Sequence, residues 1–183
     1  MNWRRATLGF LLLLAGGAGV YWWWQRWLEH SQDGPIRAAA QRYGVQPALV
    51  KAVVWRESRF NPRARGRAQE LGLMQLRETA AQEWADAEGL ARFEHEHCLD
   101  SRTNTLAGAW YLKKLLRRYP RTDDPLPYAL ADYNAGRGNV LRWNYGGGAT
   151  NSAAFIEQIA FPTTKAYVKA VIARYNGYRL SFR

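Results

Sequence analysis

The sequence predicts an all-α fold, and three features of its 183 residues support this. Apolar residues recur at the helical period in several segments, whereas no segment alternates as a half-buried strand would. Glycine and proline separate these segments from one another. The composition is 48% apolar and 22% charged, which fits a chain with a packed core and excludes a disordered one. The length is best explained by one domain behind a distinct N-terminal segment.

The N-terminal segment has the features of a membrane anchor. Residues 6–24 are an uncharged run, about the length that crosses a bilayer as one helix. Arg4 and Arg5 precede it, and five of the nine tryptophans lie within the first 27 residues, where an interfacial aromatic belt is expected. We therefore predict a cytoplasmic N-terminus at 1–5, a transmembrane signal anchor at 6–24, and export of the rest of the chain.

A cleaved signal peptide is the alternative interpretation, because residues 15–19 are all small. The bulky aromatic residues 21–24 follow directly and no clear Ala-x-Ala site is present, which favours an uncleaved anchor. No cysteine lies near position 20, which excludes a lipid-modified N-terminus. The single Cys98 also excludes an intramolecular disulfide framework.

The remaining elements follow in order along the chain. Polar residues 25–35, ending in Asp33-Gly34-Pro35, predict a linker before the domain at 36–183. Stop signals such as Gly44 and Pro120 bound the helices that follow, and Pro47 suits a first helical turn. The predicted helices cover 36–43, 47–59, 78–88, 102–119, 126–133, 153–158 and 163–178.

One carboxylate lies on the apolar face of its helix. The apolar stripe of the segment 47–59 consists of Leu49, Val50, Val53 and Val54. Glu57 is the next member of this stripe at the helical period. Burial disfavours the charged form and raises the pKa of a carboxyl group, which lets a general acid keep its proton near neutral pH. The alternative is an ion pair with Arg56, Arg59 or Arg63, which would lower the pKa instead.

Three motifs then occur in a fixed order. Glu57-Ser58 is followed by Gly72-Leu73-Met74-Gln75 and, far downstream, by Ala131-Asp132-Tyr133-Asn134-Ala135-Gly136. Together they resemble the soluble lytic transglycosylase-type (SLT) domain of the goose-lysozyme-like superfamily. The likeness covers roughly residues 36–178 and includes the segments Asp100-Ser101-Arg102-Thr103-Asn104, Tyr111-Leu112 and Phe161-Pro162 with Tyr167-Val168. It implies a lysozyme-like helical domain, which here would follow the one N-terminal transmembrane helix predicted above.

The resemblance also implies a reaction. The family cleaves peptidoglycan between N-acetylmuramic acid (MurNAc) and N-acetylglucosamine (GlcNAc). By resemblance, Glu57 protonates the glycosidic oxygen and then deprotonates the 6-hydroxyl of the sugar, leaving a 1,6-anhydro-MurNAc end. Neither water, a metal nor another cofactor is required. The implied substrate-binding residues are Ser58, Gly72, Met74, Gln75, Tyr133 and Asn134. We expect the phenol of Tyr133 to bond Glu57 or the sugar, and Asn134 to brace the turn.

Several positions depart from the family pattern. Gly66 replaces a frequent Ser, and Gln69-Glu70 replaces a frequent Gly-Ala pair. Asp132 stands where Ala is common, and Thr163-Thr164-Lys165 replaces a segment with a late Glu. We expect Glu70 and Asp132 to be solvated or structural. The alternative is that either residue serves as a second carboxylate near the site, where it would hold a water and favour hydrolysis.

Two other features have simpler explanations than binding sites. The cluster 94–98, Glu-His-Glu-His-Cys, does not have the spacing of a zinc site, so we expect a solvated loop. The formal charge is +11, yet no nucleic-acid motif accompanies it. We therefore expect no nucleic-acid partner, and attribute the charge to attraction toward an anionic wall and membrane surface.

The expected protein is a lytic transglycosylase anchored in the bacterial cytoplasmic membrane by a single pass, with its catalytic domain on the periplasmic side. Its expected partners are peptidoglycan glycan strands, the membrane and cell-envelope machinery. The alternatives are a hydrolytic muramidase of the same fold and a non-catalytic peptidoglycan-binding scaffold.

Overall fold

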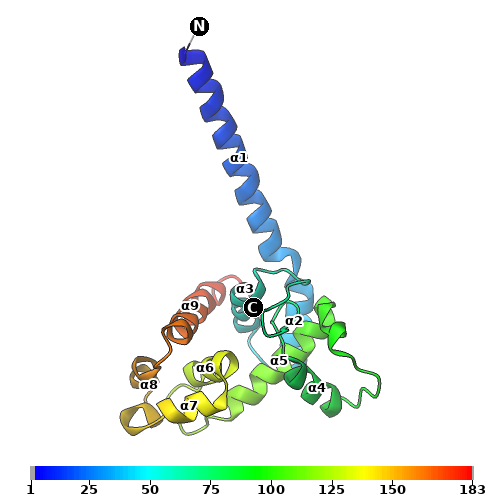
Figure 1. Cartoon of the computed structure of the whole chain (residues 1–183), viewed down its shortest axis with the longest axis vertical. Helices are drawn as coiled ribbons and strands as arrows, with labels where there is room; N and C mark the ends of the chain where they lie inside the picture. Colours follow the sequence, from blue (N-terminus) through cyan, green and yellow to red (C-terminus); the bar gives the residue numbers. More distant parts are fainter. Residues whose placement is uncertain (1–2, 183) are drawn as a thin grey trace.

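The structure is a computed structural model that describes residues 3–182, except for the side chains of residues 4–9 and 12. Across this range it consists of α-helices and short 3₁₀ helices without strands, which confirms the all-α prediction (Figure 1). In chain order the elements are α1 (Trp3–Ser31), α2 (Asp33–Tyr43), α3 (Pro47–Ser58), α4 (Glu78–Ala87), η1 (His95–Leu99), α5 (Ser101–Arg117), α6 (Leu126–Ala135), α7 (Arg137–Trp143), η2 (Gly146–Ala149), α8 (Ser152–Gln158) and α9 (Pro162–Tyr178).

Helix α1 projects away from the other helices as a single long rod (Figure 1). Large apolar side chains along it are exposed, among them Leu13 at 76% and Trp22 at 64%. Among the residues that the structure describes, no helix is long and apolar enough to cross a membrane. The side chains at 6–9 and 12, which belong to the predicted span 6–24, lie outside the described part.

The segment 25–35, predicted as a linker, is helical. Helix α1 continues to Ser31, and α2 begins two residues later at Asp33. Gly34 and Pro35 fall in the first turn of α2, where the backbone N–H that proline lacks would have no helical partner. Proline therefore permits a helix start here, and the two helices join with almost no connection.

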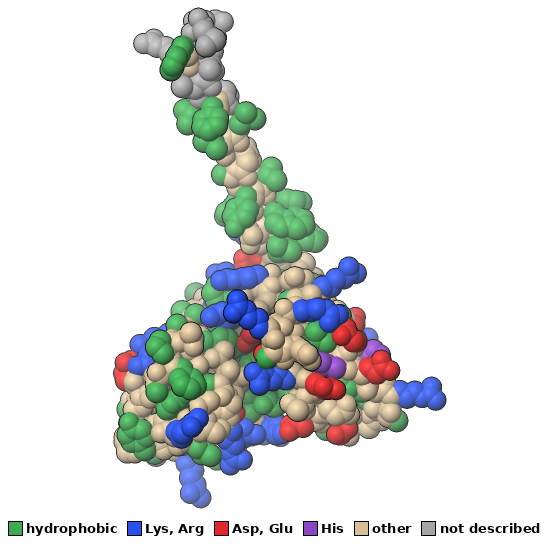
Figure 2. All heavy atoms as spheres, viewed as in Figure 1, with side chains coloured by type: hydrophobic (Ala, Val, Ile, Leu, Met, Phe, Trp, Pro, Cys, Tyr) green, Lys and Arg blue, Asp and Glu red, His purple; other side chains and the backbone are tan. Residues whose placement is uncertain are grey.

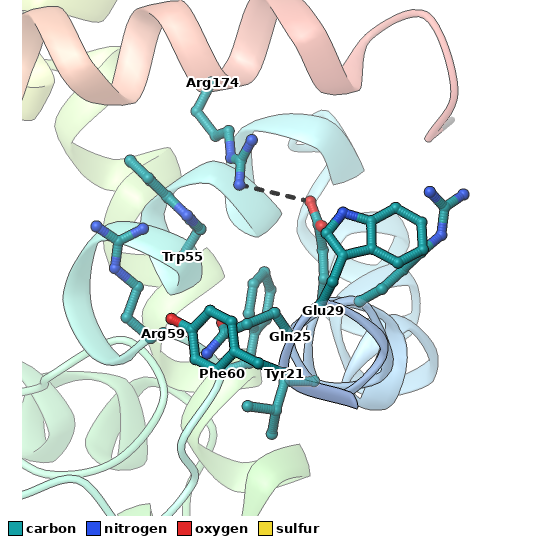
Figure 3. A pocket seen from close by; sticks show the side chains of 10 residues that line it. Tyr21, Gln25, Glu29, Trp55, Arg59, Phe60 and Arg174 are labelled. Carbon is teal, nitrogen blue, oxygen red and sulfur yellow. Dashed lines mark ion pairs between the residues drawn. The ribbon is translucent and has the colours of Figure 1, made fainter. Parts of the chain in front are cut away.

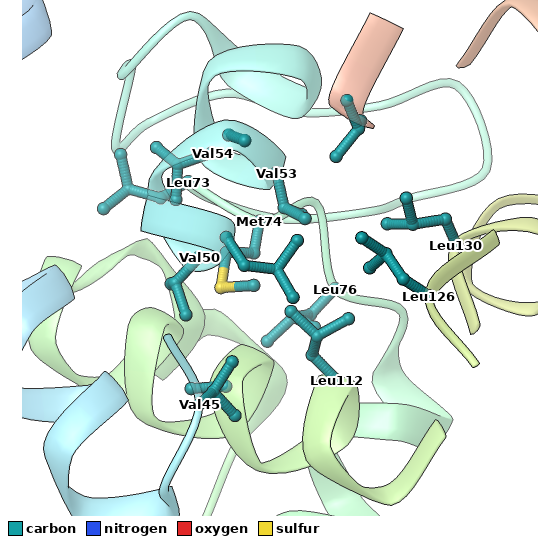
Figure 4. Close-up of a cluster of buried hydrophobic side chains, with 14 of the residues drawn as sticks. Val45, Val50, Val53, Val54, Leu73, Met74, Leu76, Leu112, Leu126 and Leu130 are labelled. Carbon is teal, nitrogen blue, oxygen red and sulfur yellow. The ribbon is translucent and has the colours of Figure 1, made fainter. Parts of the chain in front are cut away.

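The core lies between α2, α3, α5, α6 and α9 (Figure 4). Helix α2 packs on α5, and α3 packs on α9. The predicted stripe of α3 is buried, since the exposed fractions of Leu49, Val50, Val53 and Val54 are all 4% or less. Leu73, Met74 and Leu76, from the loop after α3, are buried in the same core (Figure 4). This loop is therefore anchored to the core at its C-terminal end.

The seven predicted helices are all present, with ends that differ by a few residues. Gly44 ends α2 in a left-handed conformation (φ 61°), as its position predicts. Helix α3 ends at Ser58, earlier than predicted, because Arg59 and Phe60 also take positive φ. Helix α7 was not predicted, because Gly136 reads as a break although a new helix starts directly after it.

The cluster 94–98, predicted as a solvated loop, instead lies largely in the 3₁₀ helix η1. The Glu94 side chain caps this helix together with His97, and Glu96 pairs with Arg65 at 2.7 Å. Cys98 is fully buried, and burial raises the pKa of its thiol to about 12. The capping by Glu94 and His97 and the burial of Cys98 thus give a helical turn to a segment whose composition is typical of a loop.

Candidate active site

A cavity of about 450 Å³ lies where the end of α3 meets the loop 59–77 and the C-terminal half of α6. Its lining combines three carboxylates, an arginine, amides and two tyrosines, so its surface is largely polar. The residues used below that line it are Glu57, Glu70, Gln75, Arg77, Tyr111, Asp132, Tyr133 and Asn134. The cavity brings together residues from all three predicted motifs.

Glu57 lies in the last turn of α3 and faces this cavity. Burial is the main influence on its carboxyl group, and the pKa rises from 4.5 to about 7. The neighbouring charge of Glu70 raises it further, while the hydrogen bond from Tyr167 and the charge of Arg56 lower it. No ion pair joins Glu57 to a described residue, so the alternative of a salt-bridged, low-pKa carboxylate is wrong.

The hydrogen-bond donor to Glu57 is Tyr167, to which the sequence assigned no role. Its hydroxyl donates to Oε1 of Glu57 over 2.6 Å. Tyr167 lies on α9 and is 2% exposed, and Arg56 lies over its ring at 5.4 Å. The helical period of α9 places this ring in the core. Only the packing of α9 on α3 places its hydroxyl beside Glu57.

Tyr133 lines the cavity, but its hydroxyl donates its hydrogen bond to a group other than Glu57. It donates to the backbone oxygen of Met74 over 2.6 Å, and so ties α6 to the loop that carries the second motif. Its ring lies 5.7 Å from that of Tyr111, which also lines the cavity. The two rings form an aromatic wall of the cavity, and of the two only Tyr133 was predicted as a site residue.

Gln75 holds the loop and faces the cavity. Its Nε2 donates to the backbone oxygens of Ala64 and Gly72, over 3.1 and 3.0 Å. Its backbone has a φ of 48°, uncommon for a residue with a side chain. The amide group is therefore fixed in place by the loop that it closes.

Three of the predicted substrate-binding residues do not line the cavity. Met74 is fully buried, and its N–H donates to Oδ1 of Asn104. The hydroxyl of Ser58 donates back to Val54 of its own helix. A Cβ on Gly72 would come within 2.2 Å of the Cys98 backbone oxygen, so the close approach that glycine permits is to the protein itself.

Asn134 lines the cavity and braces the end of α6. Its Oδ1 accepts a hydrogen bond from the hydroxyl of the buried Thr164 over 2.8 Å. Thr164 belongs to the segment that departs from the family pattern, on α9. This contact fixes α6 relative to the helix that carries Tyr167.

The two additional carboxylates have different surroundings. Asp132 is 2% exposed and accepts from Arg118 over 2.6 Å and from Tyr119 over 2.7 Å, which agrees with the structural role expected for it. Glu70 lines the cavity, accepts from the backbone N–H of Ala68 over 3.0 Å and lies 3.5 Å from Arg77.

The departures at positions 66 and 70 are sterically linked. A Cβ on Gly66 would lie 2.2 Å from Oε2 of Glu70 and 2.8 Å from Oε1 of Gln75. Glu70 in this position therefore requires glycine at 66, and a serine there would displace the carboxylate. The two replacements act as one change to the wall of the cavity.

Several proteins similar to this chain are named as lytic transglycosylases. The chain is 38% identical over 108 residues to membrane-bound lytic murein transglycosylase F of Desulfosudis oleivorans, covering 57% of this chain and 22% of that protein. It is 36% identical over 119 residues to membrane-bound lytic murein transglycosylase C of Shigella sonnei, covering 62% and 33%. The chain thus spans a third or less of the length of these relatives.

Two solved structures share the fold. An inactive mutant of lytic transglycosylase Slt from Pseudomonas aeruginosa superposes with a TM-score of 0.73 at 26% identity, covering 80% of this chain and 24% of that one. The 70 kDa soluble lytic transglycosylase of Escherichia coli gives 0.69 at 28% identity, covering 79% and 24%. The profile of the Transglycosylase SLT domain matches residues 34–156. With two thirds of its length matched in this way, the chain belongs to the Transglycosylase SLT domain family.

Proposed function

We propose that the chain is a peptidoglycan lytic transglycosylase that cleaves the β-1,4 bond between MurNAc and GlcNAc. The observation that carries this proposal is Glu57, a mostly buried carboxyl group at a polar cavity whose pKa of about 7 keeps a large share of it protonated at neutral pH. The names of both relatives and of both similar structures support the same activity.

A single carboxyl group suffices for both steps of the proposed reaction. Glu57 donates its proton to the glycosidic oxygen as the bond from C1 of MurNAc to that oxygen breaks, which leaves an oxocarbenium-like centre. The 6-hydroxyl of the same MurNAc then attacks C1 and gives its proton to Glu57. The acid is regenerated, and the product is a 1,6-anhydro end with no water consumed.

The surroundings of Glu57 suit both steps. The neutral form of the carboxyl group is favoured over the charged form in a largely buried position. Once it has lost its proton, the hydrogen bond from Tyr167 stabilises the negative charge until the 6-hydroxyl returns a proton. A pKa of about 7 makes proton donation and proton return similarly favourable at neutral pH.

Hydrolysis by a muramidase of the same fold is the second candidate, and one observation favours it. Glu70 is a second carboxylate in the same cavity, where it is able to hold and activate a water. Mass spectrometry of digested sacculi separates the candidates. We expect anhydro-MurNAc ends, and ends heavier by one water would replace the transglycosylase proposal with the muramidase one.

We also propose that α1 anchors the domain in the bacterial cytoplasmic membrane through residues 6–24, with 1–5 in the cytoplasm and 36–183 on the periplasmic side. The uncharged run, the exposed apolar side chains of α1 and its projection from the domain support this placement. Both relatives are named as membrane-bound.

The anchor is tested by extracting membranes from cells that express the full chain. We expect the protein to stay in the membrane pellet at alkaline pH, and protease added from the periplasmic side to digest the domain. Release at alkaline pH would overturn the anchor, and protection from protease would overturn the orientation.

A further inference from the structure

A second cavity of about 500 Å³ lies between the C-terminal part of α1 and the domain, and Glu57 is not among the residues that line it (Figure 3). Helix α1 contributes one side of it, and the end of α3, the residues just after it, and α9 contribute the other. Arg59, Trp55 and Arg174 face α1 across the opening (Figure 3). The reaction proposed for Glu57 uses none of these groups.

The cavity is rich in positive charge. Three arginines line it, Arg26, Arg59 and Arg174, against one carboxylate, Glu29. Glu29 lies 3.7 Å from Arg174 and also accepts a hydrogen bond from Tyr178, whereas within the described part of the chain Arg26 and Arg59 have no carboxylate partner. Figure 2 shows Lys and Arg side chains gathered on the surface where α1 meets the domain.

Arg59 and Arg174 lie close together, because both contact the ring of Trp55. Burial, and then the charges of Arg56 and Arg174, lower the pKa of Arg59. The Nε of Arg174 is buried and has no hydrogen-bond partner among the described groups. A buried donor without an acceptor costs free energy, as does the repulsion between like charges. An anion in the cavity would relieve both.

Aromatic rings fix the positions of these arginines. The guanidinium of Arg59 lies 3.9 Å from the centre of the Trp55 ring, and that of Arg174 lies 4.7 Å from it. Arg26 lies 5.4 Å from the ring of Trp22. Stacking on a ring leaves the N–H groups at the edge of a guanidinium free to donate, and their planar fork matches a phosphate.

The position of the cavity along α1 identifies the kind of anion. Tyr21 and Trp22 line the cavity and also belong to the exposed aromatic cluster Tyr21–Trp24 with Trp27. Such a cluster lies at the level of the lipid headgroups when its helix spans a membrane. The arginines are therefore at the same depth as the phosphates of the lipids that would surround α1.

We infer that this cavity binds the phosphate headgroup of an anionic phospholipid, a site that rests on the proposed membrane anchor. Basic pockets beside membrane helices recognise anionic lipids in this way. The volume is sufficient for a glycerol phosphate headgroup. A bound headgroup would bridge α1 and α9, and so fix the tilt of the domain, and of the Glu57 cavity, relative to the membrane.

The test is native mass spectrometry of the full chain, released from detergent micelles that contain equal amounts of phosphatidylglycerol and phosphatidylcholine. We expect adducts of phosphatidylglycerol to predominate on the wild type. The Arg26→Gln and Arg59→Gln substitutions should each lower their amount about fivefold. Arg92→Gln is the matched control, because Arg92 is exposed and distant in sequence from this cavity. Arg26 lies on the exposed face of α1, so its loss does not disturb the core.

Two outcomes would overturn the lipid site. One is equal retention of the two lipids by the wild type, and the other is a loss that is the same in Arg92→Gln as in the cavity variants. Adducts of inorganic phosphate as abundant as those of phosphatidylglycerol would mean that the cavity binds a soluble anion and not a lipid.

Failure of the anchor is detected separately, by sedimentation with vesicles of phosphatidylcholine alone. A wild type that sediments but retains both lipids equally overturns the lipid site and leaves the anchor. A wild type that does not sediment overturns the anchor and the lipid site with it.

Discussion

The hydroxyl of Tyr167 donates a 2.6 Å hydrogen bond to Oε1 of Glu57, from a position 110 residues further along the chain. Two effects therefore oppose each other at this carboxyl group. Burial raises its pKa, and the donated hydrogen bond, which stabilises the charged form, lowers it. The value of about 7 results from both, with burial the larger effect.

Replacing Tyr167 by Phe removes the donor while keeping the ring in the core. The pKa of Glu57 should rise further, and the falling limb of the pH–rate profile should move to higher pH. The rate should fall about tenfold, because the charged form loses a hydrogen bond worth roughly 1.5 kcal/mol during the reaction. A rate loss with an unmoved pH profile would mean that Tyr167 serves only packing.

Glu57→Gln should abolish release of glycan fragments, because the amide has no proton to give to the glycosidic oxygen. General acid–base groups contribute about 10²–10⁴-fold to rates, so the residual activity should fall by at least a hundredfold. The measurement is release of soluble fragments from purified sacculi, with circular dichroism to verify folding. Unchanged release by a folded variant would favour the non-catalytic scaffold.

The same substitution should change the dependence of stability on pH. The pKa of Glu57 is about 7 in the folded chain and about 4.5 when unfolded, so between these values the folded state binds a proton that the unfolded state lacks. Stability from this group is full below pH 4.5 and is lost as pH rises through 7. The total is at most about 3.5 kcal/mol, since one pKa unit corresponds to about 1.4 kcal/mol.

Glu57→Gln lacks this dependence, because its amide does not titrate. The free energy of unfolding of the variant, relative to wild type, should therefore increase between pH 4.5 and 8. Denaturant titrations at several pH values measure the difference. A constant difference across this range would show that Glu57 titrates normally.

Glu70→Gln removes a negative charge that raises the pKa of Glu57. The falling limb of the pH–rate profile should consequently move to lower pH, opposite to the effect of Tyr167→Phe. Glu157→Gln is the control, since Glu157 is exposed on α8 and does not line the cavity. An unmoved profile would contradict this electrostatic effect. If Glu70 also activates water, its substitution would in addition remove any hydrolytic products.

Helical periodicity was sufficient to predict much of the fold and the position of Glu57. The stripe of α3 required only local spacing, because the residue that follows Val53 and Val54 on that face must enter the core or the cavity. Glycine and proline set most of the helix ends. The helical segment 25–35 was missed, because proline is compatible both with a linker and with a first turn.

Contacts between distant segments could not be predicted from spacing. Tyr167 is as suited to a core as to a hydrogen bond with Glu57, and only the packing of α9 on α3 distinguishes the two. The same applies to Lys51, which the α3 pattern does not mark as buried. It is 1% exposed, with its Nζ 2.6 Å from Asp33. Such pairs depend on how the helices assemble, which no local pattern contains.

Gly72 provides the sharpest test of the loop that carries the second motif. Its φ is 77°, and an added Cβ would lie 2.2 Å from the Cys98 oxygen and 2.3 Å from Nδ2 of Asn104. Gly89 has a similar φ of 69° with nothing within 4 Å of an added Cβ. Gly89→Ala should therefore cost only the backbone strain, about 1 kcal/mol.

Gly72→Ala carries the same backbone strain. In addition, its methyl group would collide with the Asn104 amide and the Cys98 backbone oxygen, and both would have to move. Asn104 is fully buried and bonds Met74, Leu71 and Cys98, so displacing it leaves buried polar groups unpaired. We expect Gly72→Ala to lower the free energy of unfolding by at least about 2 kcal/mol more than Gly89→Ala does. Equal losses in denaturant titrations of the two variants would mean that the loop relaxes around the methyl group.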